Sequence, residues 1–419
     1  MRRNIYNAIY YCLLGVFLIM IAMLALIQQE KFLLHVFDLL GIILIVNSLY
    51  ELSVFYRRHF KGSLLQIVFN LSGGILIILF PDIPIRLLLI IFALYITLNG
   101  IIKFICYLNY KKDRVSYRLH VLVGSLFLII NGLALLGGNY MTYQNIMFFI
   151  SGYGILLGVN YIIDAIFIII PQQQRDSLKR RFRIPLPLFI SALLPKVMMD
   201  HINECMKKRI EEYEIIEDKE ANIEIWIHVS DDGFGTVGHC DICIDEQVIS
   251  YGNYDRDSIS MFEAIGDGVL FIAPRDRYLK FCIETYQQTI FSYNLKLTIK
   301  QLNSVKREIE RMMKHTYSWF PRAYYENNYC KDYASKVYLA TKAAFFKFKA
   351  GRFKTYFVLG SNCVKLVEKI MGKGGLDIID LNGIIAPGTY QTYLEKEFQR
   401  LNGLVVSKNI YNRLTKYPK

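Results

Sequence analysis

Long apolar runs occupy the first 170 residues of the chain, and short polar segments separate them. A helix needs about 20 apolar residues to cross the roughly 30 Å of hydrocarbon in a bilayer, because lipid offers its backbone groups no hydrogen-bond partners. The pattern therefore predicts that residues 1–170 form an all-α transmembrane domain of six helices. We place these helices at 9–27, 33–55, 63–80, 85–108, 119–138 and 143–170.

The polar segments between the helices alternate in charge. The weakly charged ones lie at 28–31, 81–84 and 137–140, and the strongly basic ones at 2–3, 57–61, 111–114 and 175–183. Basic flanks of membrane helices stay on the cytoplasmic side. We therefore expect an integral protein of the inner (cytoplasmic) membrane, with its N-terminus and everything after Pro171 in the cytoplasm. No cleavable signal peptide is evident, because the first apolar run is long and others follow it.

The six helices can be grouped into three hairpins, in which the second helix carries a repeated polar pair. An asparagine is followed four residues later by a charged residue, so both lie on one helix face. The pairs are Asn47 with Glu51, Asn99 with Lys103, and Asn160 with Asp164. We expect the asparagines to bond between helices in a bundle that serves as an anchor, and transport is the alternative. This half resembles the HdeD (domain of unknown function 308) membrane family over about residues 5–170, which implies tandem hairpin repeats.

Residues 171–219 form a basic linker between the two halves of the chain. The cluster Lys179–Arg183 suits anionic lipid headgroups. The apolar run Ile184–Pro195 is too short and too rich in proline to cross the bilayer, so we expect it to lie along the membrane surface. A charged helix is expected at Met198–Asp218, leading into a separate domain.

Mixed polar and apolar sequence at 220–400 predicts an independent α+β domain, followed by a basic tail at 401–419. Paired strands come first and helices after them. Strands are expected at Ile223–Val229, His239–Asp245, Val248–Tyr251 and Gly268–Ile272, and helices at Val305–His315, Lys331–Phe346 and Asn362–Met371. The fold class is therefore multidomain: a transmembrane bundle joined to an α+β domain.

Two short segments of this domain carry candidate chemistry. His239 opens a strand that turns back on itself at an Asp-Glu pair. Cys363 falls in the first turn of a helix that Ser361 can cap and whose apolar residues lie on one face. The helix dipole favours a thiolate at that position, and a histidine on a neighbouring strand could complete the ion pair that a thiol nucleophile needs. The backbone N–H of Cys363 would supply half of an oxyanion hole.

At these residues the chain resembles the papain-like NlpC/P60 superfamily, in its circularly permuted, lecithin–retinol acyltransferase-like branch. In that branch the histidine hairpin precedes the cysteine helix, as His239 precedes Cys363 here. The resemblance covers about residues 220–400 and implies a papain-like cysteine hydrolase domain. It also implies that Cys363 is the nucleophile, that His239 is the base, and that a third polar residue lies at Tyr251. The alternatives for the third residue are Ser250, Asn253 and Asp255.

Structural roles are the competing interpretation for the same residues. Cysteine is often buried, so Cys363 can be a core residue and His239 an ordinary strand residue. His228, on a strand of its own, is expected to be structural. The Cys240-x-x-Cys243 spacing suggests zinc or redox chemistry, but on a strand the two thiols would point to opposite faces. We expect free thiols, no metal and no cofactor.

The net charge of +13 in a chain that is 53% hydrophobic is better explained by membrane flanks than by nucleic acid. The stretch 345–354 mixes aromatic and basic residues, which suits a membrane interface; the alternative is that its phenylalanines are buried. The leading hypothesis is a membrane-tethered thiol hydrolase or acyltransferase that cleaves an ester or amide bond through a thioester, on an inner-leaflet lipid or lipid-linked substrate. The alternatives are a catalytically silent binding or sensing module and a peptidase or amidase acting on cytoplasmic peptides.

Overall fold

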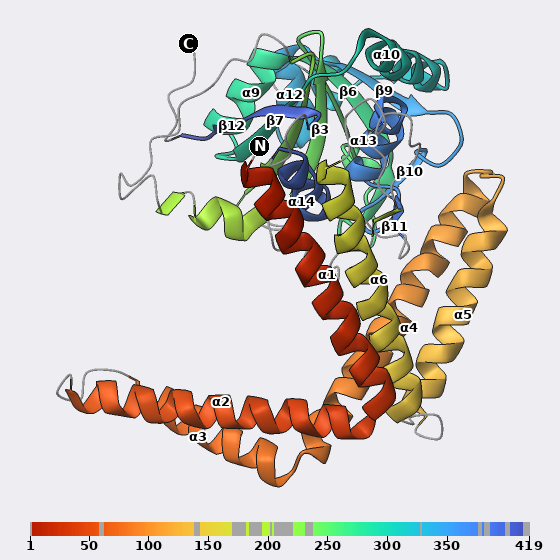
Figure 1. Cartoon of the computed structure of the whole chain (residues 1–419). Coiled ribbons are helices and arrows are strands. Elements are labelled where there is room, and N and C mark those ends of the chain that lie inside the picture. Colours follow the sequence, from red (N-terminus) through yellow and green to blue (C-terminus); the bar gives the residue numbers. More distant parts are fainter. Residues whose placement is uncertain are drawn as a thin grey trace. The chain divides into compact units, whose positions relative to one another are not determined.

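The computed structural model (Figure 1) divides by its internal contacts into two units. The residues that it describes are 2–57, 63–137, 143–169, 182–183, 195–201, 203–204, 221–230, 238–326, 329–375, 379–380, 386–398 and 403–413. One unit comprises Asn7–Ile101 and Val123–Ile166, and the other comprises Met1–Tyr6, Ile102–Leu122 and Phe167–Lys419. The expected surface segment up to residue 194 and most of the expected helix after Met198 lie outside the described residues.

Six helices form the N-terminal part of the described chain. They are α1 (Arg2–Gln28), α2 (Glu30–Arg57), α3 (Leu64–Leu79), α4 (Asp82–Lys112), α5 (Arg118–Leu136) and α6 (Tyr143–Ile169). Five of the described helices are long and apolar enough to cross a membrane, which confirms the membrane character of this part. Helix α3 has 16 residues, fewer than the roughly 20 that a perpendicular crossing needs. A sixth crossing therefore stays a prediction.

Glycines allow the helices of the membrane unit to approach closely, but not within the expected hairpins. A Cβ added to Gly15 of α1 would lie 2.6 Å from the carbonyl oxygen of Gly158 in α6, and one added to Gly74 of α3 would lie 2.8 Å from the carbonyl oxygen of Gly41 in α2. A Cβ on Gly100 of α4 would meet Ile129 of α5 at 2.7 Å. Each contact joins helices of different hairpins, so glycines bind one hairpin to the next.

The asparagines of the repeated polar pairs bond within their own helices where the structure gives a partner. Asn47 donates to Glu51 over 3.3 Å, and Asn99 donates to the carbonyl oxygen of Tyr95 over 2.8 Å. The expectation of bonds between helices was wrong for these two residues. The reason is that a side-chain amide readily reaches a group one helical turn away on its own helix.

The two glycine environments on α6 give a test of this packing. Gly158→Ala forces α1 and α6 apart and should cost about 1–3 kcal/mol, the usual penalty for overpacking. Gly152→Ala is the matched control, because a Cβ there meets nothing within 4 Å. We expect thermal unfolding in detergent to show a lower Tm for Gly158→Ala and an unchanged or slightly higher Tm for Gly152→Ala. Equal Tm values for the two variants would contradict the packing.

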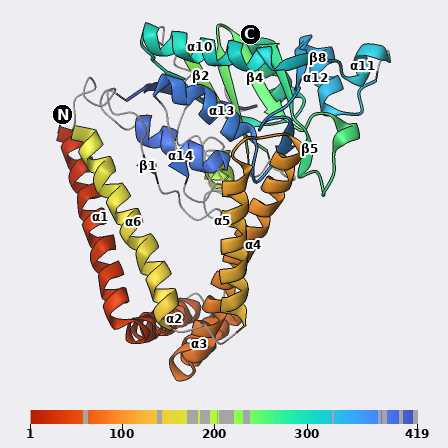
Figure 2. The ribbon, with the colours of Figure 1, turned by 90° about the vertical axis from the view of Figure 1, so that its right-hand side faces the viewer.

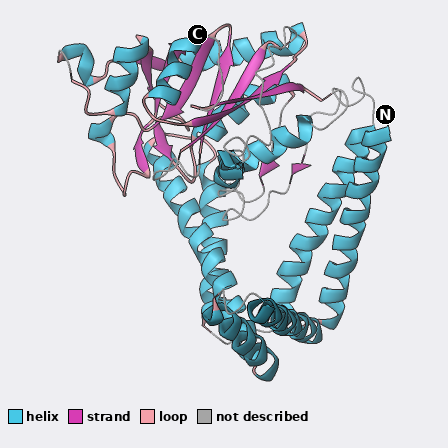
Figure 3. Ribbon diagram, turned by 90° about the vertical axis from the view of Figure 1, so that its left-hand side faces the viewer, coloured by secondary structure: helices cyan, strands magenta, loops and turns pink. Residues whose placement is uncertain are grey.

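An eight-stranded antiparallel sheet forms the centre of the C-terminal part, with helices against both faces (Figure 3). Its order is β12-β7-β2-β3-β4-β6-β9-β8. The strands are β2 (Ile223–Val229), β3 (His239–Ile244), β4 (Gln247–Gly252), β6 (Val269–Pro274), β7 (Thr289–Leu295), β8 (Thr316–Trp319), β9 (Ala344–Phe348) and β12 (Val405–Tyr411). Two small pairs accompany it: β1 (Phe182–Arg183) with β11 (Ile379–Asp380), and β5 (Ile265–Asp267) with β10 (Thr355–Phe357).

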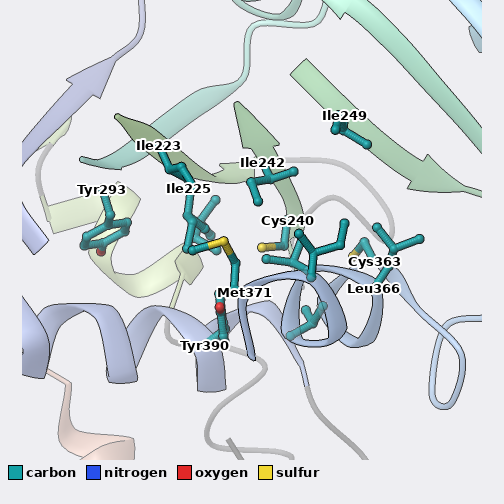
Figure 4. Packing of buried hydrophobic residues seen from close by; sticks show 14 of the residues in the cluster. Ile223, Ile225, Cys240, Ile242, Ile249, Tyr293, Cys363, Leu366, Met371 and Tyr390 are labelled. Carbon is teal, nitrogen blue, oxygen red and sulfur yellow. The ribbon is translucent and has the colours of Figure 1, made fainter. Parts of the chain in front are cut away.

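The helices of this part are α9 (Arg275–Glu284), α10 (Ile299–Lys314), α11 (Arg322–Tyr325), α12 (Tyr333–Thr341), α13 (Cys363–Met371) and α14 (Pro387–Phe398), with short 3₁₀ turns η2 (Arg256–Ser258) and η3 (Gly372–Gly374). Because side chains alternate along a strand, each sheet face has its own core. One core joins the sheet to α10, α13 and α14, and Figure 4 shows Cys240 and Ile242 of β3 facing α13 in it. The other core joins the sheet to α9 and α12.

The α+β class and the first strands agree with the sequence prediction, while three boundaries differ. The helix expected at Lys331–Phe346 ends at Thr341, and the chain continues as strand β9. Lys342 ends it in a left-handed conformation, with φ of 57°. Helix α10 begins six residues before the expected Val305, after a Thr298 capping box. Strand β12 lies in the expected tail and pairs with β7, so the sheet extends past residue 400.

Candidate active site

A buried carboxylate on β3 lies between two imidazole rings. Oδ1 of Asp241 is 2.9 Å from Nε2 of His239, and its Oδ2 is 2.9 Å from Nε2 of His228. Asp241 and His239 are two residues apart on one strand, so they share a face. His228 lies directly opposite His239 on β2. The Asp241 side chain is fully buried and His228 is 2% exposed, whereas His239 keeps 23% of its side chain exposed.

His228 is held by a further polar partner on its other side. Its Nδ1 lies 3.1 Å from Oε1 of Gln288, which makes it the donor to that oxygen. The rings of His228 and His239 meet edge to face with centroids 5.9 Å apart. Both nitrogens of His228 thus have polar partners, and the ring orientation is fixed.

Two hydroxyl groups complete the surroundings of His239. Its Nε2 lies 3.0 Å from Oγ of Ser250 and 3.1 Å from the hydroxyl of Tyr254. The two hydroxyls bond to each other over 2.7 Å, and Tyr254 stacks on Tyr333 of α12. Three oxygen atoms therefore surround Nε2, and the other ring nitrogen, Nδ1, is left for a different partner.

The Cys363 thiol lies near this imidazole, close enough for its charge to act on His239. Cys363 is the first residue of α13, and Asn362 caps the helix by accepting from the backbone N–H of Lys365 over 3.1 Å. The N-cap of α13 is therefore Asn362 and not the expected Ser361. Tyr356 on β10 lies near the same thiol, whose charge acts on its hydroxyl. Cys363 belongs to the core on the α13 face of the sheet. His239 is the first residue of β3 and lies between Cys363 and the polar cluster on the other face.

Burial and charge act against each other at this site. Burial would lower the pKa of His239, but the Cys363 thiolate and the Asp241 carboxylate outweigh burial and raise that pKa well above its usual value. Burial would likewise raise the pKa of Asp241, yet the imidazoles of His239 and His228 lower it below its usual value. Burial raises the pKa of Tyr356 well above its usual value, so its hydroxyl keeps its proton. The arrangement therefore favours the protonated form of His239 beside the carboxylate of Asp241.

The structure brings Cys363 and His239 together, as expected, but it places Tyr251 elsewhere. Tyr251 lies on the α13 face, and its hydroxyl donates to the carbonyl oxygen of Phe353 over 3.0 Å. Of the alternatives, only Ser250 reaches His239. The others have different partners: Asn253 donates to the carbonyl oxygen of Glu263, and Asp255 pairs with Lys347. Tyr251 was therefore a wrong choice for the group that orients the imidazole.

Sequence reasoning missed Asp241, Tyr254 and Tyr356 as contacts of the Cys-His pair. A signal was available for Asp241, because the His-x-Asp spacing on a strand puts both side chains on one face. His228 was expected to be structural, yet it contacts the same carboxylate.

Other expectations about these segments have clear outcomes. Cys240 and Cys243 lie in different cores on opposite sheet faces, as expected. The described cysteines are free thiols. Phe345, Phe348 and Phe353 of the stretch 345–354 are buried, which agrees with the alternative interpretation of that stretch.

Substituting Asp241 should change how stability depends on pH. A histidine with a raised folded-state pKa stabilises the fold below its unfolded pKa of 6.5, and this contribution is lost as pH rises through the folded value. A carboxyl group with a lowered pKa stabilises the fold above 3.8, and this contribution is lost as pH falls. We expect the Tm advantage of wild type over Asp241→Asn to be largest between about pH 4 and 6.5 and to shrink in alkaline solution.

Ser250→Ala is the control for that measurement, since it removes a neutral partner of the same imidazole. Its Tm difference from wild type should vary little with pH. A pH-independent difference for Asp241→Asn as well would show that its charge is not coupled to His239.

Comparison with known proteins places the N-terminal part only. Two segments, residues 13–73 and 65–137, match the family model described as "Short repeat of unknown function (DUF308)". Their starting points are 52 residues apart (65 minus 13), about the length of one helical hairpin. No curated protein and no solved structure matches the chain. The N-terminal helices thus carry HdeD-like repeats over residues 13–137.

Proposed function

We propose that this protein is a membrane-tethered thiol hydrolase or acyltransferase with Cys363 as its nucleophile. The observation that carries the proposal is that Cys363 and Asp241 both act on His239: the carboxylate of Asp241 lies 2.9 Å from its Nε2, and the charge of Cys363 raises its pKa. A nucleophile, a base and a group that orients the base form the minimal set for acyl transfer. Here the three come from β3 and the first turn of α13.

The reaction follows from these positions. The thiol proton moves to Nδ1 of His239, and Sγ of Cys363 attacks the substrate carbonyl carbon to give a tetrahedral oxyanion. Collapse of this species breaks the bond to the alcohol or amine, which takes the proton from His239, and a thioester remains on Cys363. Water or an acceptor hydroxyl or amine then attacks the thioester, with His239 as base, and the thiol is restored.

Two donors near Cys363 suit the developing oxyanion. The N–H groups in the first turn of a helix have no acceptor within the helix, so the backbone N–H of Cys363 is available. The Tyr356 hydroxyl lies near the thiol and keeps its proton because burial raises its pKa. Together they would form the oxyanion hole.

Asp241 sets the tautomer and the charge of His239. A carboxylate at Nε2 stabilises the imidazolium that forms as the thiol loses its proton. His228 shares this carboxylate and fixes its position from the opposite side. The role that the family resemblance gave to Tyr251 would thus belong to Asp241.

The surrounding architecture makes a lipid or lipid-linked acyl substrate the preferred class. The hairpin β3–β4 followed later by the Cys363 helix agrees with the order of a permuted papain-like domain, which we propose for this part of the chain. We also propose six membrane crossings, with the domain on the cytoplasmic face. Cell-wall peptide would then be out of reach, which leaves acyl or amide bonds at the inner leaflet or in cytoplasmic peptides.

The burial of Cys363 favours the second candidate, a catalytically silent binding or sensing module. Its side chain is 3% exposed, and buried cysteine is usually structural. A reactivity measurement separates the two functions, because a structural thiol in a core reacts slowly while a nucleophile must be reached by its substrate.

Alkylation of the full-length protein in lipid nanodiscs measures that reactivity. A thiolate held by an imidazolium reacts with iodoacetamide near pH 6, where an ordinary thiol, with a pKa near 8.5, reacts slowly. We expect mass spectrometry to find Cys363 modified first at pH 6, and its rate to fall at least about tenfold in His239→Ala. Exposed Cys330 is the internal reference, and its rate should be the same in both proteins.

A slow, His239-independent reaction of Cys363 would remove the enzyme proposal and leave the binding module. His228→Ala should lie between wild type and His239→Ala, because it loosens Asp241 without removing the base.

Turnover of a p-nitrophenyl acyl ester tests the oxyanion hole. Loss of one such donor usually lowers kcat by about 10²–10³, so we expect a loss of this size for Tyr356→Phe with little change in KM. Tyr251→Phe is the matched control: it is an equally buried tyrosine on the same sheet face whose hydroxyl bonds to a backbone carbonyl instead. Equal activity of the two variants would exclude Tyr356 from the oxyanion hole.

A further inference from the structure

A short turn in the C-terminal part presents two apolar side chains to the outside. We name Met261–Ala264 the 261–264 tip; it closes a bridge between Ser260 and Ile265. Phe262 is 97% exposed and Met261 is 54% exposed. Exposing a whole phenylalanine to water forgoes the free energy of burying it, so the tip is unfavourable in water.

The backbone of the 261–264 tip is held in a conformation that L-amino acids rarely adopt. Met261, Phe262 and Glu263 have φ values of 50°, 54° and 66°, all in the left-handed region. Each such residue costs conformational free energy, because its Cβ lies too close to the following carbonyl oxygen. Bonds at its ends hold the turn: the N–H of Ala264 donates to Met261, and the side chain of Asn253 donates to the carbonyl oxygen of Glu263. Strain therefore accompanies the exposure of Phe262.

The base of the 261–264 tip packs on a membrane helix. Ala264 and Ile265 lie in one apolar cluster with Phe357 of β10 and with Ile102 and Cys106 of α4. Figure 2 shows β5, which follows the tip, beside the end of α4. All of these residues belong to the same unit of the structure.

The length of α4 indicates the depth of this cluster. Counted from Ile83, the first apolar residue of α4, about 20 residues at 1.5 Å each cover the roughly 30 Å of hydrocarbon, and the count ends at Ile102. Lys103 follows directly, and the last turn carries Lys111 and Lys112. Ile102 therefore marks the boundary between hydrocarbon and headgroups, and the segment packed on it lies at that boundary.

We infer that the 261–264 tip inserts into the lipid bilayer, with Met261 and Phe262 in the acyl-chain region and Glu263 among the headgroups. Insertion is favourable because it transfers the exposed side chain of Phe262 from water to an apolar environment. It also explains why a strained turn points an aromatic side chain outward next to a membrane helix. The inference depends on α4 as a membrane span and not on the chemistry of Cys363.

Insertion would also place the candidate site at the membrane surface. Phe357 packs in the same cluster as the base of the tip and is separated from Cys363 by a short turn, closed by the bond from the N–H of Gly360 to Phe357. An acyl chain leaving the bilayer beside the tip would have a short path to the thiol.

Depth-dependent quenching of fluorescence tests the insertion. Phe262→Trp, in the full-length protein in nanodiscs, is compared with the parent protein, whose Trp226 and Trp319 supply the background. We expect the added fluorescence to be blue-shifted, and to be largely lost when the lipids carry bromine near the carbonyl end of their acyl chains.

Ile299→Trp is the matched control, since Ile299 begins α10 and is an apolar side chain 79% exposed. Its added fluorescence should stay red-shifted and unquenched by brominated lipid. Red-shifted, unquenched fluorescence from Phe262→Trp would overturn the inference, and equal quenching of both variants would show non-specific contact and overturn it too. Neither measurement involves activity, so failure here leaves the proposed function standing.

Discussion

The buried carboxylate of Asp241 constrains the three strands β2, β3 and β4 at the centre of the C-terminal sheet. A charge without solvent must be compensated, and removing one partner of a buried pair typically costs about 3–5 kcal/mol. Its partners come from two strands, His239 from β3 itself and His228 from β2, while Ser250 of β4 bonds to the same His239. The adjacency of β2, β3 and β4 is therefore required by the polar cluster as well as by the apolar cores on either side.

The sequence contained enough information to place part of this cluster. A two-residue turn at Asp245 and Glu246, both with left-handed φ, fixes the register of β3 against β4. Ile242 pairs with Ile249, so Asp241 faces Ser250, and Tyr251 must lie on the opposite sheet face. The spacing in the resembling family pointed to Tyr251 as the third polar residue. The alternation of side chains along β4 excludes it, because Tyr251 and His239 lie on opposite faces of the sheet. Strand β12 and the approach of Cys363 to His239 had no such local signal, because both depend on packing between segments that are far apart in the sequence.

For the aromatic residues too, the local sequence does not predict which side chains the fold buries. The stretch 345–354 has the composition of an interfacial segment, yet β9 is an inner strand of the sheet and its phenylalanines fill the cores. Lys347 belongs to that strand and pairs with Asp255 and Asp267 instead of lipid. The sequence around Phe262 lacks this mixed aromatic and basic composition, yet Phe262 is nearly fully exposed. The composition of a segment indicates whether it is suited to lipid, but only residues that the fold leaves exposed can contact lipid.

The end of α4 connects the membrane part to the candidate site through specific bonds. The carboxylate of Asp113, buried just after α4, accepts from the backbone N–H of Thr355, and its carbonyl oxygen accepts from Gly351. Arg352 lies over the ring of Tyr110. The segment fixed in this way carries Tyr356 and leads directly to Cys363. For the function proposed above, a nucleophile and its oxyanion donors would require a rigid scaffold, and the end of α4 would then contribute to the geometry of the site.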